Sequence, residues 1–357
     1  MFLNDILARQ LPPTLPAGLK KEDWAAYRKE TIEKFMREEY GFTPPAPACV
    51  RAEKGPYEPN AWAGKADSYP VKLSFDTPKG EFSFTANIVL PHADHPLPMF
   101  LYISFLPYPN GRYGPIEEIV DNGYAMATFC YNDVTLDKDD NFESGLAAMY
   151  PRENPETDWG KIGMWAFAAS RVMDYVQTLP QIDKSRIFAL GHSRLGKTAI
   201  WTAVQDERFA AGCSNDSGCS GAAITRQKHG EHVKEITKNF PYWFCGNYQK
   251  YIDRENEMPF DQHQLLALMA PRTLYVASAV EDLWSDPYSE FMSAKLASDA
   301  YELLGVTGLV NPTGEMIGVN EHLHEGNVGY HMRAGKHFMS RDDWKQYMAY
   351  FDKHYPG

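Results

Sequence analysis

Ser193 lies in a segment whose residue types and spacing suit nucleophilic catalysis. The segment Gly191-His-Ser-Arg-Leu-Gly-Lys197 follows a short β-rich run at 186–189 and leads into a helical pattern at 198–204. On such a tight strand-to-helix turn, a serine hydroxyl projects above the sheet, and the amides at the helix start face a developing oxyanion. The second glycine comes three residues after the serine, one later than in G-x-S-x-G, and an ordinary turn with a serine helix cap fits this segment alone equally well.

An acid and a histidine follow Ser193 in the order that suits acyl transfer. The nucleophile needs a base within hydrogen-bond reach and an acid that orients the base. Glu281 and Asp282 follow a short apolar run, at a strand end where catalytic groups gather in open sheets. His337 lies in a glycine-containing loop before the last helical pattern of the chain. The order serine, acid, histidine therefore predicts a catalytic triad.

Two cations flank the candidate nucleophile, and the remaining histidines indicate no metal site. Arg194 and Lys197 stand at a helix start, where positive charge opposes the helix dipole, and this favours a role at an oxyanion or an oxygen-rich substrate. His192 precedes the nucleophile on the turn, so its ring points elsewhere and we expect a packing or supporting role. The pair His322-x-His324 is insufficient for zinc binding, and we expect no metal and no cofactor.

The elements that position these residues alternate between strands and helices. An amphipathic helix is expected at 21–39, and an antiparallel hairpin at 71–75 and 82–90. Short apolar runs predict strands at 99–104, 124–130, 186–190, 210–214 and 273–278. Helical patterns between or after them cover 159–179, 287–304 and 342–350. Alternation of this kind indicates βαβ units and a parallel sheet covered on both faces.

An antiparallel start that feeds a parallel sheet, with a serine turn midway, is the plan of the α/β-hydrolase fold. We therefore predict an α/β protein, a three-layer αβα sandwich with a mostly parallel central sheet and an antiparallel N-terminal edge. The absence of a Ser/Gly-rich tract, a charge block or a repeat favours one catalytic domain over residues 1–357. Residues 1–45 would form an arm and a helix packing on it.

The composition limits the classes of partner. The formal net charge of −12 argues against nucleic acid or an anionic membrane as the partner. Aromatic residues make up 13% of the chain, which suits a sugar-binding cleft or an aromatic core. The five cysteines are an odd number and show no zinc spacing. Because Met1 to Arg9 lacks the pattern of a secretory signal, we expect a cytoplasmic protein, or a secreted one where a leader has been removed.

Six ordered blocks between Tyr124 and the C-terminus resemble the glucuronoyl esterases, carbohydrate esterase family 15, in their bacterial form. The family pattern G-[CH]-S-R-x-G-K-x-A stands here as Gly191-His-Ser-Arg-Leu-Gly-Lys-Thr-Ala199. The other blocks are 214–223 with Arg226 and Gly230-Glu231, then 239–247, Asp261-Gln-His263, 281–287 and His331-x-Arg-x-Gly-x-His337. Fungal members pair a cysteine at the place of His192 with one beside the catalytic histidine. Lys336 and Phe338 flank His337 here, so the resemblance implies no such disulfide.

The resemblance implies a role for each matched residue. Ser193 would attack the C6 ester carbonyl of a glucuronic acid branch of xylan, and His337 would take the proton and return it to the leaving alcohol. Arg194 would hold the oxyanion through its backbone N–H and its guanidinium. The positions that match binders of the glucuronate hydroxyls and the 4-O-methyl group are Lys197, Glu231 and Trp284.

The acid of the triad has two candidate positions in this family. One follows the strand after the nucleophile helix and is Asp216 here, where many members have glutamate. The other is Asp282. Aspartate is one methylene shorter than glutamate, so we favour Asp282, whose strand-end position is the general hydrolase solution, and keep Asp216 as the alternative acid.

Two other functions remain open on the same residues. An acetyl xylan esterase, or another short-acyl carbohydrate esterase, would use the same fold and triad without a need for a uronate site at Lys197, Glu231 and Trp284. A non-catalytic carbohydrate-binding protein would have no use for a base behind a serine. The alcohol released from a glucuronate ester depends on loops near Gly111 to Tyr113 and at 132–150, and the sequence leaves the oligomeric state open.

Overall fold

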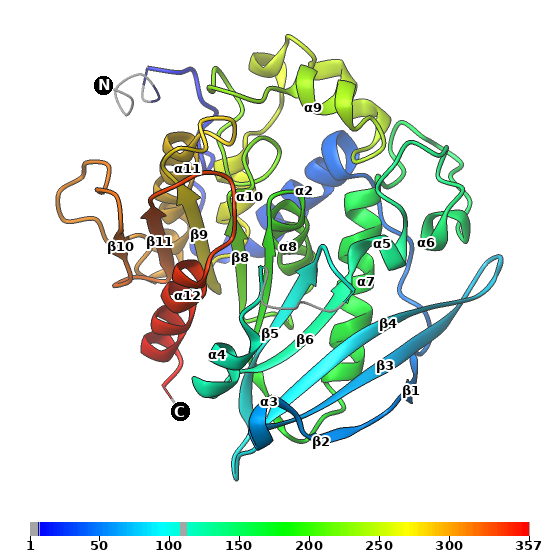
Figure 1. Ribbon diagram of the computed structural model, residues 1–357. Helices are drawn as coiled ribbons and strands as arrows, with labels where there is room; N and C mark the ends of the chain where they lie inside the picture. The colour runs from blue at the N-terminus through cyan, green and yellow to red at the C-terminus, as the bar shows by residue number, and fades with distance from the viewer. Residues whose placement is uncertain (1–5, 7, 108–112, 357) are drawn as a thin grey trace.

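One mixed sheet runs through the protein (Figure 1). The computed structural model describes residues 6, 8–107 and 113–356, and within them eleven strands join in the order β1-β3-β4-β6-β5-β7-β8-β9-β11-β10, with β2 paired to β3. The segment from β6 to β11 is parallel, and antiparallel strands complete both edges. The strands are β1 (Arg51–Lys54), β2 (Glu58–Asn60), β3 (Ala66–Thr77), β4 (Gly80–Pro91), β5 (Leu97–Ser104), β6 (Ala125–Cys130), β7 (Ile182–His192), β8 (Ala211–Asn215), β9 (Thr273–Ala279), β10 (Glu321–Leu323) and β11 (Val328–Arg333).

Helices cover both faces of this sheet. The long helices are α2 (Trp24–Phe35), α7 (Lys161–Val176), α8 (Arg194–Gln205), α11 (Pro287–Leu304) and α12 (Arg341–His354). The short helices are α3 (Ala61–Gly64), α4 (Ile116–Asp121), α5 (Tyr131–Val134), α6 (Gly145–Ala148), α9 (Val233–Asn239) and α10 (Gln262–Ala267). Turns of 3₁₀-helix occupy Lys21–Asp23, Gly246–Tyr251 and Glu255–Glu257, and a π-helical turn occupies Met36–Tyr40.

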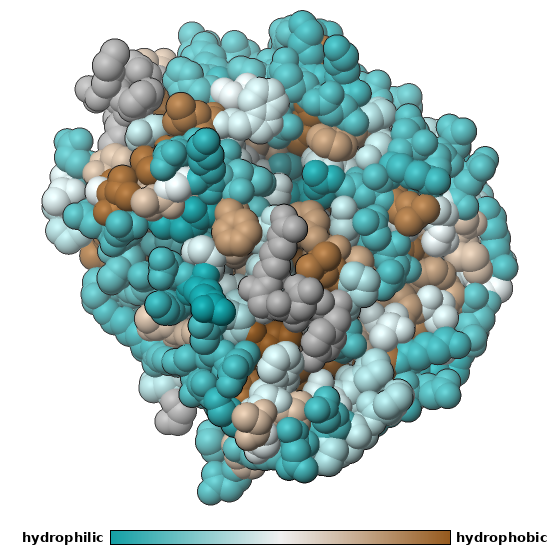
Figure 2. Space-filling model, viewed as in Figure 1, coloured by the Kyte–Doolittle hydropathy of each residue, from teal (hydrophilic) through white to brown (hydrophobic). Residues whose placement is uncertain are grey.

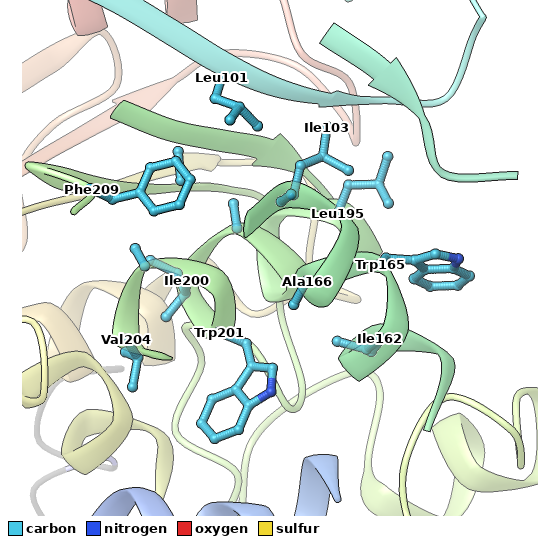
Figure 3. Close-up of a cluster of buried hydrophobic side chains, with 14 of the residues drawn as sticks. Leu101, Ile103, Ile162, Trp165, Ala166, Leu195, Ile200, Trp201, Val204 and Phe209 are labelled. Carbon is cyan, nitrogen blue, oxygen red and sulfur yellow. The ribbon is translucent and has the colours of Figure 1, made fainter. Parts of the chain in front are cut away.

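The alternation of side chains along the strands divides the core in two. In β5, Met99, Leu101 and Ile103 face the layer that contains α7 and α8. Figure 3 shows this layer, where Leu101 and Ile103 of β5 lie near Leu195 of α8, while Trp201 projects from the side of α8 that faces away from the sheet. A fully buried Leu or Ile side chain contributes about 1.5–3 kcal/mol to folding. This packing fixes α8, and with it the residue that precedes α8, against the sheet.

On the opposite face, α4 and α12 cover the sheet. Phe100 and Tyr102 of β5 meet the Trp344 ring of α12 edge to face. Phe188 of β7 and Phe351 of α12 stack in parallel, with ring centroids 3.8 Å apart. The terminal helix is therefore locked onto the strand that leads to Ser193.

The predicted α/β fold is confirmed, and most predicted elements lie within a few residues of the observed ones. The expected helix at 21–39 divides into a 3₁₀ turn, α2 and a π-helical turn, and the helix at 287–304 is α11. Strand β11 is not among the predicted strands. Its residues Gly329, His331 and Arg333 place small and polar groups on one face of a buried strand, so the usual apolar run is missing.

The surface agrees with the acidic, polar composition. Hydrophilic residues cover most of the face seen in Figure 2, and separate apolar patches interrupt them. Among the described helices, none has the length and apolar character needed to cross a membrane.

Candidate active site

Ser193 occupies a strained turn between β7 and α8. Its backbone has φ 59° and ψ −126°, a region that residues with a side chain rarely adopt. A Cβ at Gly191 would lie 2.1 Å from the carbonyl oxygen of Leu195, and a Cβ at Gly196 would lie 3.1 Å from the carbonyl oxygen of Gly191. The two glycines therefore allow the strand end and the first helical turn to touch. A glycine three residues after the serine meets the steric need of the turn.

His337 and Asp282 form a hydrogen-bonded pair. Nδ1 of His337 lies 2.6 Å from Oδ2 of Asp282, which follows β9 by three residues. Burial opposes ionisation of Asp282, but hydrogen bonds from His337 and Ser285 outweigh burial and lower the pKa of this carboxyl. An ionised carboxylate accepts only, so Nδ1 carries the hydrogen and Nε2 is left as the proton acceptor.

Asp216 lies in the same cluster but is bonded elsewhere. A carboxylate oxygen of Asp216, one of Asp282 and a ring nitrogen of His337 all lie within 4.8 Å of one another. Oδ1 of Asp216 accepts from the amide of Ala279 at 2.6 Å, and Oδ2 accepts from Arg333 at 3.1 Å. Burial, reinforced by Glu290, raises the pKa of Asp216 well above its usual value. Of the two candidate acids, the structure places Asp282 on the imidazole and Asp216 on a backbone amide and an arginine.

His192 links the nucleophile turn to His337. The centroids of the two imidazole rings are 4.5 Å apart. Nδ1 of His192 lies 2.6 Å from Oδ1 of Asn215, and burial lowers the pKa of His192 to about 3, with the charge of His337 adding to this shift. His192 is therefore neutral at ordinary pH and supports the His337 ring by packing.

Arg194 begins α8, and its guanidinium is fixed by Asp137. The two side chains form an ion pair, and the guanidinium carbon lies 5.1 Å from the Phe240 ring centroid and 4.7 Å from that of Trp243. Asp137 is nearly buried and also accepts from Trp243 Nε1 at 2.8 Å. The first amides of a helix have no acceptor within the helix. Together these donors can stabilise a negative oxygen next to Ser193.

Lys197 and Glu231 interact through their charges, and the backbone joins Glu231 to Trp284. Lys197 is one helical turn after Ser193, and its buried ammonium donates to the carbonyl of Ser217. Burial lowers the pKa of Lys197, and the charge of Glu231 opposes that shift. The amide of Glu231 donates to the carbonyl of Trp284 at 3.0 Å, and residue Trp284 is 53% exposed. A cation, a carboxylate and an open aromatic face suit an oxygen-rich ring.

These contacts form a closed circuit. Ser193 leads through α8 to Lys197, whose charge interacts with Glu231. A backbone hydrogen bond joins Glu231 to Trp284, which follows Asp282 by two residues. Asp282 holds His337, and His337 packs on the residue before Ser193. These contacts therefore connect the predicted triad with the three residues expected to bind the uronate.

The remaining histidines and the cysteines that the sequence pointed to lie outside this set of contacts. His324 and His331 contact the hydroxyl of Tyr275 at 2.7 and 2.9 Å, and His331 also contacts Asp343. The five cysteines are free, and Cys219 and Cys245 are both buried. Gly111 and Arg112, expected on the alcohol side, lie outside the described residues, as do the first five residues of the chain.

The sequence did not reveal two of the functional candidates, Asp137 and Arg333. Asp137 lies in the long polar segment at 132–150, where no periodic pattern indicates which residue faces inward. Arg333 belongs to the motif that ends at His337, but nothing in the motif shows that its guanidinium turns back into the site. For Asp137, only its acidic character in a loop between two predicted elements hinted at a partner for Arg194.

The mixed sheet, the strained serine between β7 and α8, and the histidine after the last parallel strand define an α/β-hydrolase. A family model described as glucuronyl esterase, fungi, matches residues 74–305. The solved structure of a glucuronoyl esterase from Solibacter usitatus superimposes with a TM-score of 0.89 and 36% sequence identity, and the match covers 98% of both chains. The chain therefore belongs to the glucuronoyl esterase family, carbohydrate esterase family 15, and the predicted resemblance is confirmed.

Two curated relatives extend this comparison. Carbohydrate esterase MZ0003, from an unknown prokaryotic organism, is 42% identical over 247 residues, which are 68% of this chain and 56% of the relative. A 4-O-methyl-glucuronoyl methylesterase of Podospora anserina is 28% identical over 341 residues, which are 90% of this chain and 65% of the relative. The chain thus spans less than two thirds of the length of these two relatives.

Proposed function

We propose that the chain is a serine carboxylic-ester hydrolase that cleaves esters of glucuronic acid and its 4-O-methyl form, as found in glucuronoxylan-derived material. Family membership supports this proposal, as do the names of a Solibacter usitatus structure and a Podospora anserina relative. The observation that carries it is the 2.6 Å contact between His337 and Asp282, within a circuit that also contains Ser193, Lys197 and Glu231.

In the proposed mechanism, Oγ of Ser193 attacks the C6 carbonyl carbon and Nε2 of His337 takes the hydroxyl proton. The bond to the alcohol oxygen then breaks, and His337 returns the proton to that oxygen. Water repeats the sequence on the acyl-enzyme and releases glucuronate. Ionised Asp282 holds the Nδ1–H tautomer and stabilises the imidazolium that forms between the steps.

The tetrahedral oxyanion needs donors that are already in place. The backbone N–H of Arg194 at the start of α8 supplies one, and the Arg194 guanidinium supplies another. Asp137 and the stacked rings of Phe240 and Trp243 hold that guanidinium still before the substrate arrives. Loss of one oxyanion donor lowers kcat by about 10²–10³-fold in other hydrolases.

The acyl side of the substrate would bind between Lys197, Glu231 and Trp284. The ammonium of Lys197 and the carboxylate of Glu231 can bond sugar hydroxyls, and the exposed Trp284 ring can cover an apolar sugar face. An acetyl ester has no sugar on its acyl side, so it would offer no hydrogen bonds to Lys197 and Glu231.

The test compares hydrolysis of benzyl glucuronate with hydrolysis of an acetylated xylo-oligosaccharide. The parent protein and Ser193→Ala are measured together with Ser185→Ala, in which an exposed serine of β7 is removed. We expect cleavage of the glucuronate ester by the parent and by Ser185→Ala, loss of cleavage in Ser193→Ala, and little deacetylation. Preference for the acetyl ester would assign a short-acyl esterase, and inactivity on both esters would reject the catalytic proposal.

A further inference from the structure

The guanidinium of Arg333 is buried at the end of β11, four residues before His337. Its Nε donates to both carboxylate oxygens of Asp343, at 2.8 and 3.1 Å, and Nη2 donates to Asp216 at 3.1 Å. Its Nη1 donates to the carbonyl oxygens of Ala334 and Lys336, at 2.9 and 3.2 Å. The planar guanidinium therefore donates hydrogen bonds to two carboxylates and to two backbone carbonyls.

These partners belong to three separate elements. Asp216 directly follows β8, and Asp343 lies in the first turn of α12, where it also accepts from the amide of Ser340 at 2.6 Å. Ala334 and Lys336 lie in the loop that joins β11 to α12. Arg333 therefore ties the end of a central strand, the start of the terminal helix and the intervening loop to one point.

The loop that Arg333 holds carries the proposed base. The side chain of His337 is 43% exposed, and its neighbours Lys336 and Phe338 are exposed as well. Gly335 has φ 93°, and its carbonyl accepts from the amide of Glu281 at 3.0 Å. Met339 anchors the far end of the loop in the core, but residues 334 and 336–338 are exposed. Hydrogen bonds to the backbone of this exposed part therefore help to set where the imidazole lies.

We propose that Arg333 is a positioning residue that holds His337 in register with Asp282 and Ser193. This inference rests on the proposed ester hydrolysis. Catalytic groups must stay within about 0.5 Å of their productive geometry, and Arg333 provides that restraint through the carbonyls on either side of Gly335. It acts through the loop, because its donors are directed to Asp216, Asp343 and the two carbonyls.

The inference predicts a change in how the rate depends on the leaving alcohol. During acylation the bond from Ser193 Oγ to the carbonyl carbon forms, the bond to the alcohol oxygen breaks, and His337 passes the serine proton to that oxygen. A benzyl alkoxide is a poor leaving group and needs this proton, whereas a 4-nitrophenolate leaves without it. A displaced His337 therefore slows the benzyl ester more than the 4-nitrophenyl ester, while a loss of folded protein slows both equally.

The test measures kcat/KM for benzyl and 4-nitrophenyl glucuronate in the full chain, since this parameter reports acylation. Arg333→Lys keeps a cation between Asp216 and Asp343 but loses the planar fork, and Arg333→Met removes the charge. The matched control is Arg341→Lys, an exposed arginine that begins α12 and pairs with Glu118. Thermal unfolding is followed for each variant.

We expect the ratio of benzyl to 4-nitrophenyl kcat/KM to fall at least about tenfold in Arg333→Lys, which is part of the roughly 10²–10⁴-fold that general acid catalysis contributes. The ratio should stay unchanged in Arg341→Lys. An unchanged ratio in folded Arg333→Lys would overturn the inference. Failure of Arg333→Lys to fold would overturn it too, because Arg333 would then be needed for the fold. A parent protein that cleaves neither ester would reject the proposed function instead.

Discussion

Replacement of Asp282 by asparagine tests the proposed triad through a single hydrogen bond. The side chain of Asp282 is only 5% exposed, so solvent screens its contact with His337 weakly. A hydrogen bond to a charged group contributes about 1.5–3 kcal/mol. At about 1.4 kcal/mol for each factor of ten, loss of this bond in the transition state lowers kcat about 10–150-fold.

The geometry around Asp282 adds a second, larger effect. Oδ1 of Asp282 accepts from the amide of Ser285 at 3.4 Å. Asparagine keeps this bond only if its oxygen faces Ser285, which turns its NH₂ group toward Nδ1 of His337. The imidazole then carries its hydrogen on Nε2 and cannot accept the proton of Ser193. The wrong tautomer brings the expected loss in kcat to about 10³–10⁴-fold.

The assay is kcat and KM for benzyl glucuronate at neutral pH, with Asp216→Asn as the matched control. In that control an amide NH₂ faces the guanidinium of Arg333, which costs about 1–3 kcal/mol of stability, but the bond between Asp282 and His337 stays. We expect less than a tenfold loss of kcat and a lower Tm in Asp216→Asn. The reasoning is refuted if Asp282→Asn keeps normal turnover while folded Asp216→Asn loses it.

Three other experiments test the acyl site and one buried carboxyl, Glu290. Lys197→Met should raise KM for benzyl glucuronate at least about tenfold, because a lost hydrogen bond to a charged group costs about 1.5–3 kcal/mol. Hydrolysis of 4-nitrophenyl acetate should stay within a few-fold of the parent. Equal losses on both esters would argue against uronate binding. Gly230→Ala places a Cβ 2.4 Å from the carbonyl oxygen of Trp284, so KM should rise as the two loops separate, and an unchanged KM would contradict the proposed pocket. Burial raises the pKa of Glu290 to about 7, so the folded state binds a proton that the unfolded state releases near pH 4–5, and stability is lost as the pH rises through about 7. The Tm of the parent should therefore fall more between pH 5 and 8 than the Tm of Glu290→Gln; parallel Tm curves would show that Glu290 does not titrate in this range.

Much of the fold follows from local patterns. The apolar runs of β5, β6 and β9 and the helical period of α11 reflect burial on both sheet faces or on one helix face, and these patterns are readable in sequence. Strand β11 was not readable, because the pairing of His331 and Arg333 with Asp343 is what allows polar side chains inside the core. That pairing depends on a helix that begins eight residues later.

The features of the site can also be separated into those that the sequence indicates and those that depend on the tertiary structure. The sequence alone determined the kinds of residue present and their order along the chain. It also indicated the sharp turn at Ser193, since glycines on both sides of a serine are needed where a strand end and a helix start come into contact. The tertiary structure decided which carboxyl meets His337, because Asp216 and Asp282 follow neighbouring strands and differ only in the partners that the fold supplies. It also decided that Asp137 restrains Arg194 and that Arg333 turns back to the loop of its own strand. Hydrogen bonds between side chains distant in sequence depend on distances of a few tenths of an ångström, which no local pattern encodes.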